Sequence, residues 1–440
     1  MRADSRRGTR HRQVAAAVVG NTLEWYDFIV YGFFSGIIAR LFFPAESQYA
    51  SLLMSLATFG VGFFMRPVGG VLLGLYADRK GRKAAMQLII FLMTLSIALI
   101  AFAPTYATIG PAAPVLIVAA RMLQGFATGG EYASSTAFLV ESAPAHRRGL
   151  YGSWQLIGQC LSVFAGAAMG AWATRNLSPG ALDSWGWRVP FAIGLLIGPV
   201  GLWIRRHMEE TDAFLDASKA AGQPAISVSG VLRDNLRGVL VSIGQTVTGT
   251  AVFYVMLVNL PTFAHKTFGL PLDQVFNVQM LAVALLTVTI PVAASLSDRI
   301  GRRPVLLAGM LALLTVTYPL FSWLAAAPSM GRLLVMQLVI CVNIGIIYGP
   351  APTALAEQFA TRTRSTSIAL AYNLAVMLFG GFAPFIVTWL MRASGSPVAP
   401  AWYVLFATLF GLAASVFMRE GAPAVLERRR YRGDTIVSAE

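Results

Sequence analysis

The chain has 440 residues, of which 56% are hydrophobic and 12% are charged, and it carries a formal charge of +14 with a mean hydropathy of +0.64. A water-soluble domain has roughly 45–50% apolar and about 25% charged residues. The excess of apolar surface excludes an ordinary soluble domain and predicts an all-α membrane protein. The cations fall in short clusters between apolar stretches and form no basic face, which argues against a nucleic-acid partner.

Membrane-spanning helices need roughly 20 apolar residues each. The sequence predicts twelve, at residues 14–39, 51–77, 84–104, 113–140, 150–174, 187–204, 234–264, 274–297, 304–326, 332–358, 365–391 and 399–418. We therefore expect two six-helix bundles, 14–204 and 234–418, joined by a linker at 205–233 and flanked by tails at 1–13 and 419–440.

The placement of Lys and Arg predicts the orientation. Of the 34 cations, 26 fall in the tails and loops on one side of the predicted membrane. Cytoplasmic loops carry an excess of Lys and Arg. We therefore expect both termini to be cytoplasmic in a multi-pass protein of the cell inner membrane.

Two passages repeat across the halves of the chain. Residues 74–83 resemble residues 294–303 at an offset of 220, and the pair Glu141 and Arg148 resembles the pair Glu357 and Arg364 at an offset of 216. Parallel six-helix repeats build one class of transporter. The shared positions are a predicted gating motif, with an ordinary positive-inside loop as the alternative: Gly74, Asp78, Arg79, Gly81, Arg82, Asp298, Arg299, Gly301 and Arg302.

The pattern D-R-x-G-R-[RK] between the second and third predicted spans resembles the signature of the major facilitator superfamily. This resemblance implies two pseudo-symmetric six-helix bundles. Residues 20–28, 65–70, 121–132 and 185–191 further resemble the metabolite–proton symporter family. That family includes carriers of citrate and tricarballylate, α-ketoglutarate, shikimate, and proline or betaine.

Within this family, residues 153–159, 209–214 and 323–332 look most like the citrate and tricarballylate carriers, which are related to α-ketoglutarate permease. The chain departs from the motif at Ala294, where the pattern has glycine, and this predicts looser packing there. The second half also has no charged residue well inside a span, which argues against a third buried cation for a tricarboxylate.

Five charged residues lie inside the predicted spans of the first half: Glu24, Asp27, Arg66, Arg121 and Glu131. A charge at the bilayer centre costs about 2.5–3.5 kcal/mol, so such residues face a cavity or a partner. The two arginines are predicted to bind a substrate carboxylate, and the three acids are predicted to carry protons. The alternative for each is a structural role, as a salt-bridge partner or, for Arg66, as a donor to helix carbonyls freed near Pro67.

Neutral polar residues complete the predicted substrate site. Each alone is typical of helix–helix contacts, but together they suit a substrate cavity: Asn21, Tyr31, Gln124, Gln155, Gln159, Tyr254, Asn343, Tyr348, Tyr372 and Asn373. The chain shows no Walker P-loop, no GxSxG elbow and no histidine at metal-ligand spacing. We therefore expect no enzyme activity, no cofactor and no metal.

These patterns predict a secondary active transporter that works by alternating access. The expected partners are a small organic anion, protons with sodium as the alternative coupling ion, and the lipid bilayer, and the chain is expected to work as a monomer. A di- or tricarboxylate is the first expected substrate, followed by α-ketoglutarate or shikimate.

Three alternatives stay open. The first is a proline or betaine symporter, a branch that carries a long C-terminal coiled coil where this chain has about twenty residues after the last predicted span. The others are a proton-antiport efflux pump and a non-transporting membrane sensor.

Overall fold

The computed structural model describes residues 2–80, 82–206, 228–361 and 363–432, which form helices and connecting turns with no strand. The helices of the first half are α1 (Arg2–Phe33), α2 (Ser35–Phe42), α3 (Gln48–Lys80), α4 (Arg82–Ala101), α5 (Tyr106–Ile109), α6 (Ala112–Thr128), α7 (Glu131–Glu141), η1 (Ala145–Arg147), α8 (Arg148–Asn176), α9 (Pro179–Ala181), η2 (Leu182–Gly186), α10 (Arg188–Gly194) and α11 (Ile197–Arg206). Those of the second half are α13 (Val228–Phe253), η3 (Tyr254–Asn259), α14 (Leu260–Phe268), α15 (Leu272–Ile300), α16 (Arg302–Ala326), α17 (Met330–Tyr348), α18 (Ala351–Ala356), α19 (Arg364–Ala375), η4 (Val376–Gly380), α20 (Ala383–Ser394), α21 (Ala399–Val416) and α22 (Pro423–Arg432).

Nine helical segments of the described residues are long and apolar enough to cross a membrane. The expected third span is present as a shorter apolar helix, Gln87–Ala101. The expected sixth span is divided between α10 and α11, and the expected first span continues from α1 into α2. Each of these three segments occupies its expected place in the chain and includes positions whose side chains lie outside the described residues.

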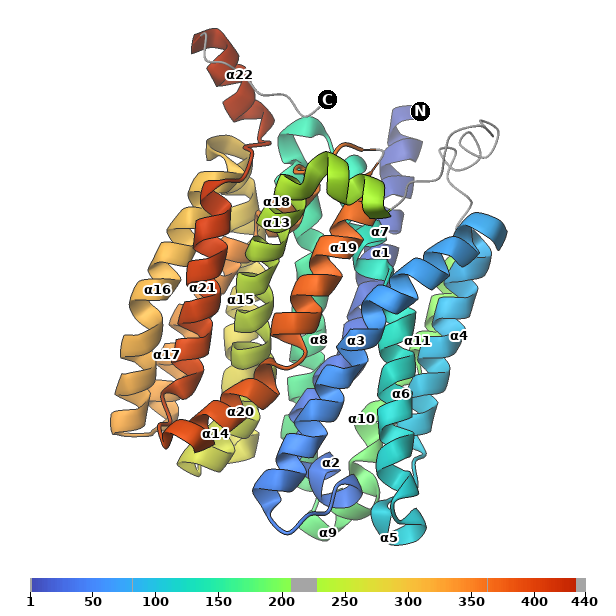
Figure 1. Ribbon diagram of the computed structural model, residues 1–440, viewed down its shortest axis with the longest axis vertical. Coiled ribbons are helices and arrows are strands. Elements are labelled where there is room, and N and C mark those ends of the chain that lie inside the picture. Colours follow the sequence, from blue (N-terminus) through green and yellow to red (C-terminus); the bar gives the residue numbers. More distant parts are fainter. Residues whose placement is uncertain (1, 81, 207–227, 362, 433–440) are drawn as a thin grey trace.

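The long helices run side by side from one end of the molecule to the other (Figure 1). Helix α1 begins and α22 ends at the same end, which we call the terminal face, and the short helices α2, α5 and α9 lie at the opposite end, the far face. This arrangement requires an even number of crossings. That the terminal face is cytoplasmic remains a prediction from the charge distribution.

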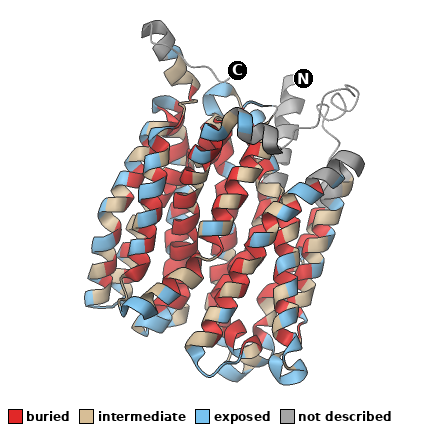
Figure 2. Cartoon of the chain, in the orientation of Figure 1, coloured by how far each residue is buried: buried red, intermediate tan, exposed pale blue. Residues whose placement is uncertain are grey.

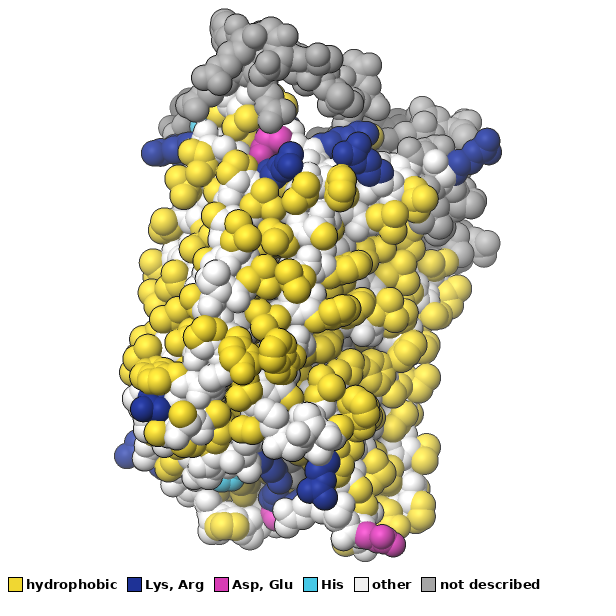
Figure 3. Space-filling model, turned by 60° about the vertical axis from the view of Figure 1, so that its left-hand side comes forward, with side chains coloured by type: hydrophobic (Ala, Val, Ile, Leu, Met, Phe, Trp, Pro, Cys, Tyr) yellow, Lys and Arg dark blue, Asp and Glu magenta, His cyan; other side chains and the backbone are white. Residues whose placement is uncertain are grey.

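The apolar residues form both the interior and the outer surface. Buried residues line the inside of the bundle (Figure 2), while large hydrophobic side chains such as Phe102, Val115 and Val288 are more than 60% exposed. Lys and Arg side chains gather near the two ends of the surface, with hydrophobic side chains between them (Figure 3). A lipid-facing belt of this kind explains the composition.

Helices α3 and α6 pack with their backbones in direct contact. A Cβ at Gly69 would collide with the carbonyl of Phe126, and one at Gly125 would collide with the carbonyl of Gly62. Small residues allow such close approach in membrane bundles. Because α3 carries Arg66 and α6 carries Arg121, this packing holds the two buried arginines on adjoining helices of the first half.

A π-helical segment, η3, interrupts the seventh span. A π-helix changes the backbone pairing locally and is often found at functional sites. The amide nitrogen of Gln279 donates to the carbonyl of Leu257 at 3.1 Å, and that of Gln337 donates both to the carbonyl of Met256 at 3.5 Å and to the side-chain oxygen of Gln279. These buried amides hold the segment that presents Tyr254 to the boundary between the halves.

Candidate functional site

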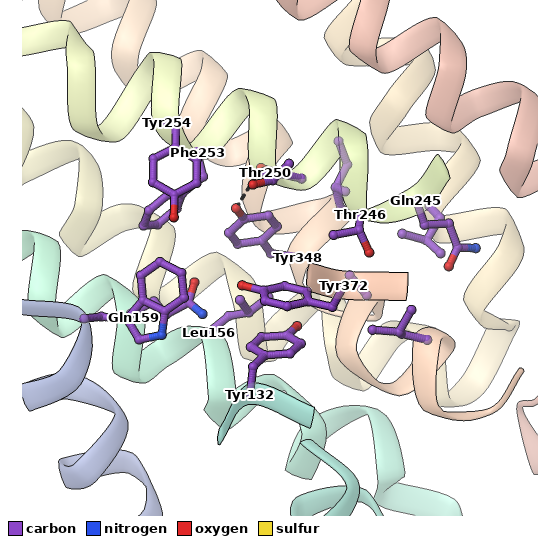
Figure 4. A pocket seen from close by; sticks show the side chains of 16 residues that line it. Tyr132, Leu156, Gln159, Gln245, Thr246, Thr250, Phe253, Tyr254, Tyr348 and Tyr372 are labelled. Atoms are coloured by element: carbon purple, nitrogen blue, oxygen red, sulfur yellow. Dashed lines mark hydrogen bonds between the residues drawn. The ribbon is translucent and has the colours of Figure 1, made fainter. Parts of the chain in front are cut away.

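A small cavity of about 60 Å³ lies at the boundary between the two halves. Figure 4 shows that aromatic and neutral polar side chains from both halves converge on it. Four of the predicted site residues line it: Gln159, Tyr254, Tyr348 and Tyr372. Further lining residues that were not among the predicted site residues are Trp25, Tyr132, Leu156, Gln245, Thr246, Gly249, Thr250, Phe253, Leu306, Ile347, Ala351 and Leu355.

Two tyrosines connect the halves beside this cavity. Tyr132 of α7 stacks on Tyr372 of α19, with ring centroids 3.6 Å apart and planes 5° from parallel. The Tyr348 hydroxyl donates to the carbonyl of Gly249 at 2.9 Å (Figure 4), which ties the tenth span to the seventh. The cavity therefore has a wall that must rearrange when the two halves move.

The two buried arginines lie against a cluster of aromatic rings. The guanidinium of Arg66 is 4.6 Å from the Phe63 ring and 4.9 Å from the Phe28 ring. The guanidinium of Arg121 is 4.7 Å from the same Phe28 ring and 4.5 Å from the Tyr31 ring. Phe28 thus contacts both cations, and the ring faces offset part of the cost of burying them.

Each guanidinium keeps unpaired donors. Nε and Nη2 of Arg66 and of Arg121 are buried without a hydrogen-bond partner, while Nη1 of Arg121 donates to Oε1 of Gln124. Buried unpaired donors are costly, more so on a charged group. A carboxylate is the acceptor that matches a guanidinium in both charge and geometry, so these arginines are suited to hold an anion.

Arg66 lies close to the cavity. Its guanidinium is 5.3 Å from the ring of Trp25, which lines the cavity. The hydroxyl of Tyr372, another lining residue, interacts with Arg66, with Glu24 and with Gln159. Glu24 is itself buried. Arg66 and Glu24 therefore lie next to residues that line the cavity.

Asp27 lies away from the cavity. Its carboxylate is buried, neither oxygen has a hydrogen-bond partner, and a Cβ at Gly194 of α10 would collide with it. Arg121 is the charged group that acts on it electrostatically. Glu131 begins α7 and is partly buried. The three acids thus differ in surroundings, and Gly194 and Arg121, the neighbours named for Asp27, both belong to the first half.

The remaining predicted amides and hydroxyls make contacts between and within helices. Asn21 donates to the carbonyl of Gln155 at 2.7 Å, and Asn373 donates to the carbonyl of Gly129 across the two halves at 2.6 Å. The Tyr31 hydroxyl donates to the carbonyl of Ser55, and Asn343 donates to that of Val339. Their binding roles stay predictions.

The second copy of the predicted gating motif forms a buried ionic network. The Asp298 carboxylate accepts from the backbone amides of Gly149 at 2.9 Å and Leu150 at 3.1 Å, at the start of α8. Arg302 pairs with Asp298 at 2.7 Å and with Glu357 at 3.3 Å. The network attaches the second half to the first at the terminal face.

Backbone geometry explains Gly301 of the second copy, whereas the first copy lies partly outside the described residues. Gly301 has φ of 112°, a conformation that favours glycine. Arg299 is exposed. In the first copy, Gly81 lies outside the described residues, as do the side chains of Asp78, Arg79 and Arg82 and the surroundings of Gly74.

Comparison with known families decides the classification. The family model described as Major Facilitator Superfamily matches residues 17–370 of this chain. The chain belongs to the Major Facilitator Superfamily. Its relatives there are transporters, so this chain is not an enzyme.

Two kinds of characterised relative are similar to nearly the whole chain. The citrate-proton symporter of Salmonella typhi is 36% identical, over 94% of this chain and 95% of the relative. The citrate-proton symporter of Klebsiella pneumoniae is also 36% identical, over 96% and 95%. The proline/betaine transporter of Salmonella typhimurium is 32% identical, over 94% of this chain and 84% of the relative.

A solved structure of the xylose transporter XylE from E. coli, in a partially occluded inward-open conformation, has the same fold. It superposes with a TM-score of 0.74 at 18% identity, covering 93% of this chain and 98% of XylE. The fold class expected from the sequence is thereby confirmed: an all-α membrane protein of the major facilitator fold, with twelve membrane helices in two six-helix bundles.

Proposed function

We propose that this protein is a secondary active transporter that carries a small organic acid anion together with protons, with a di- or tricarboxylate such as citrate as the first candidate. The observation that carries the proposal is the pair Arg66 and Arg121, buried behind a cavity at the boundary between the halves with four unpaired donor nitrogens between them. The citrate-proton symporters that are 36% identical support the substrate class.

The size of the cavity supports an alternating-access cycle. The cavity is small, about 60 Å³, and side chains of both halves line it, among them Tyr132, Tyr348 and Tyr372. An organic acid reaches a site between the halves when this wall opens. Rocking of one bundle against the other provides that opening, with the terminal face proposed as cytoplasmic.

The position of Asp27 suggests how a proton is coupled to the anion. An ionised Asp27 attracts Arg121 and competes with a substrate carboxylate for it. Protonation of Asp27 ends that competition, so proton binding and anion binding favour each other, which is the reciprocity that symport needs. Glu24 and Glu131 are the other proposed proton carriers, and Glu24 interacts with Tyr372 at the cavity.

The test is uptake by the purified protein in proteoliposomes with an imposed pH gradient, inside alkaline. Labelled citrate, tricarballylate, α-ketoglutarate and shikimate are supplied separately, with a protonophore as the control. We expect at least one of them to accumulate above its equilibrium level, and the protonophore to abolish the excess. If none accumulates, the organic-acid proposal is wrong.

A second candidate is a zwitterion that bears a quaternary ammonium group. Six of the lining residues are aromatic: Trp25, Tyr132, Phe253, Tyr254, Tyr348 and Tyr372. Aromatic faces recognise quaternary ammonium groups, and the proline/betaine transporters are 32% identical. Uptake of labelled glycine betaine by the same vesicles distinguishes this candidate from an organic acid.

The same vesicles also test the two remaining alternatives. Acidification outside the vesicles on substrate entry would indicate antiport, and binding without accumulation would indicate a sensor.

A further inference from the structure

A second cavity, of about 210 Å³, lies at the far face of the molecule. It is lined by α2, by the loop that follows it, by the first turn of α3 and by Lys266 of α14. The first three belong to the first half and α14 belongs to the second. The cavity therefore lies across the outer end of the boundary between the halves.

Two cations from opposite halves face each other here. Arg40 lines the cavity from α2, and Lys266 lines it from α14. A Cβ at Gly36, one turn before Arg40, would be 3.8 Å from Cε of Lys266, and the two cations repel each other. Like charges across a closing contact destabilise it, whereas an anion between them would stabilise it.

The balance of charge at the cavity favours an anion. Asp183 pairs with Nη2 of Arg40 at 2.7 Å, and Nη1 of Arg40 donates to the carbonyl of Gly36 at 3.3 Å. Within the described part of the chain, Lys266 forms no ion pair and no acidic residue lines the cavity. One pairing acid leaves one uncompensated cation at the cavity.

The wall supplied by α3 adds a positive potential and is fixed in place. Gln48 and Ser51 line the cavity from the first turn of this 33-residue helix, whose N-terminal end carries partial positive charge. The loop before it is held by two hydrogen bonds, from the amide of Ala45 to Ser51 Oγ and from the amide of Ala50 to Ser47 Oγ, both 3.1 Å. The cavity is thus formed before any ligand enters.

We propose that this cavity is a peripheral binding site for small polyvalent carboxylates, separate from the central cavity, where the anion bridges Arg40 and Lys266 before transport. Its volume of about 210 Å³, against about 60 Å³ for the central cavity, accommodates a small polycarboxylic acid. Such a site raises the local concentration of the anion at one entrance. The role of this site in transport rests on the proposed organic-acid function. The binding of a carboxylate by Arg40 and Lys266 does not.

The first experiment measures citrate uptake in proteoliposomes at low ionic strength for Lys266→Gln and Arg40→Gln. Arg332→Gln is the matched control, because Arg332 is a partly exposed cation of the second half that contacts Trp323 and does not line the cavity. We expect KM to rise about threefold or more in the first two variants, with the rate at saturating citrate unchanged, and the difference to shrink in high salt as the charges are screened. Equal KM values in all three variants would overturn the proposal.

The second experiment measures citrate binding by calorimetry in an Arg121→Ala background, with and without Lys266→Gln. We expect weak binding that Lys266→Gln removes, and inorganic phosphate at equal ionic strength should compete less well than tricarballylate. Binding that survives Lys266→Gln, or equal competition by phosphate, would overturn the assignment. If wild-type protein fails to accumulate citrate, the proposed function fails while this binding measurement still decides the peripheral site.

Discussion

Arg364 of α19 forms an ion pair with Glu141 of α7, with Nη1 and Oε1 2.7 Å apart. Glu141 and Arg364 come from different copies of the repeated acid–base pair in the sequence. The ion pair therefore joins the acid of the first copy to the base of the second copy. Arg364 also donates to the carbonyls of Ala356 and Phe359. The contact joins the two bundles at the terminal face.

We expect the two partners of this pair to contribute unequally to stability. Glu141 is 41% exposed, and an exposed ion pair contributes about 0–1 kcal/mol, so Glu141→Gln should lower the melting temperature little. Arg364→Gln should cost more, because two backbone carbonyls also lose their donor. Thermal unfolding of both single variants and of the double variant measures the coupling. Glu427→Gln is the exposed control, and equal losses for Glu141 and Arg364 would contradict the expectation.

Replacing Asp298 should have a much larger effect. Asp298→Asn removes the charge that holds Arg302 and weakens the acceptor for the first amides of α8, and breaking a buried pair costs about 3–5 kcal/mol. We expect a clearly lower melting temperature and reduced uptake. Asp273→Asn, at the other end of the same helix, is the control. The network has no special role in stability if the two variants melt alike.

The arginine pair should be essential for transport and sensitive to shape as well as charge. Arg66→Ala and Arg121→Ala are expected to abolish accumulation while the protein still inserts. Arg121→Lys keeps the charge but loses bidentate geometry, so KM should rise about tenfold or more. Uptake assays on these variants, normalised to the inserted amount and compared with Arg332→Ala, give the answer. Near-normal transport by both alanine variants would show that the two arginines do not form the substrate site.

Asp27 should matter for coupling more than for binding. Asp27→Asn mimics the protonated state, so the variant should still exchange labelled for unlabelled substrate across the membrane. Accumulation driven by a pH gradient should be lost. Both assays are run on the same vesicles, with Glu131→Gln for comparison. If gradient-driven uptake by Asp27→Asn matches that of the wild type, Asp27 has a structural role and does not couple protons to transport.

The contact between α3 and α6 should tolerate no side chain larger than hydrogen. Gly69→Ala and Gly125→Ala place a methyl group against a facing backbone carbonyl, which cannot move aside as a side chain can. We expect a loss of about 1–3 kcal/mol or more, seen as poor yield and a low melting temperature. Gly130→Ala is the control, because nothing lies within 4 Å of its Cβ position. Equal stability of the three variants would show that the helices can separate.

Part of the site could be predicted from the sequence because burying a charge is costly wherever it occurs. Arg66 and Arg121 stand out in apolar spans for this reason, and the structure places both in the interior of the first half. Trp25 and Phe253 could not be singled out in the same way. Aromatic residues make up 11% of the chain, so the residue type alone does not mark a site. Only the packing of α1 against the seventh span shows that these two line the cavity.

The sequence by itself determined the membrane class, the repeat and the segments that cross the bilayer, because hydropathy and the spacing of charges are local properties of a chain. Only the tertiary structure decided which neighbour each polar face meets. Glu24 and Asp27 share one side of α1 by helical spacing. Glu24 nevertheless interacts with Tyr372 of the other half, whereas the Asp27 carboxylate lies against Gly194. Residues three apart on a helix differ in direction by about 60°. Asp27 therefore meets α10, which packs against α1, whereas Glu24 points toward Tyr372 of α19.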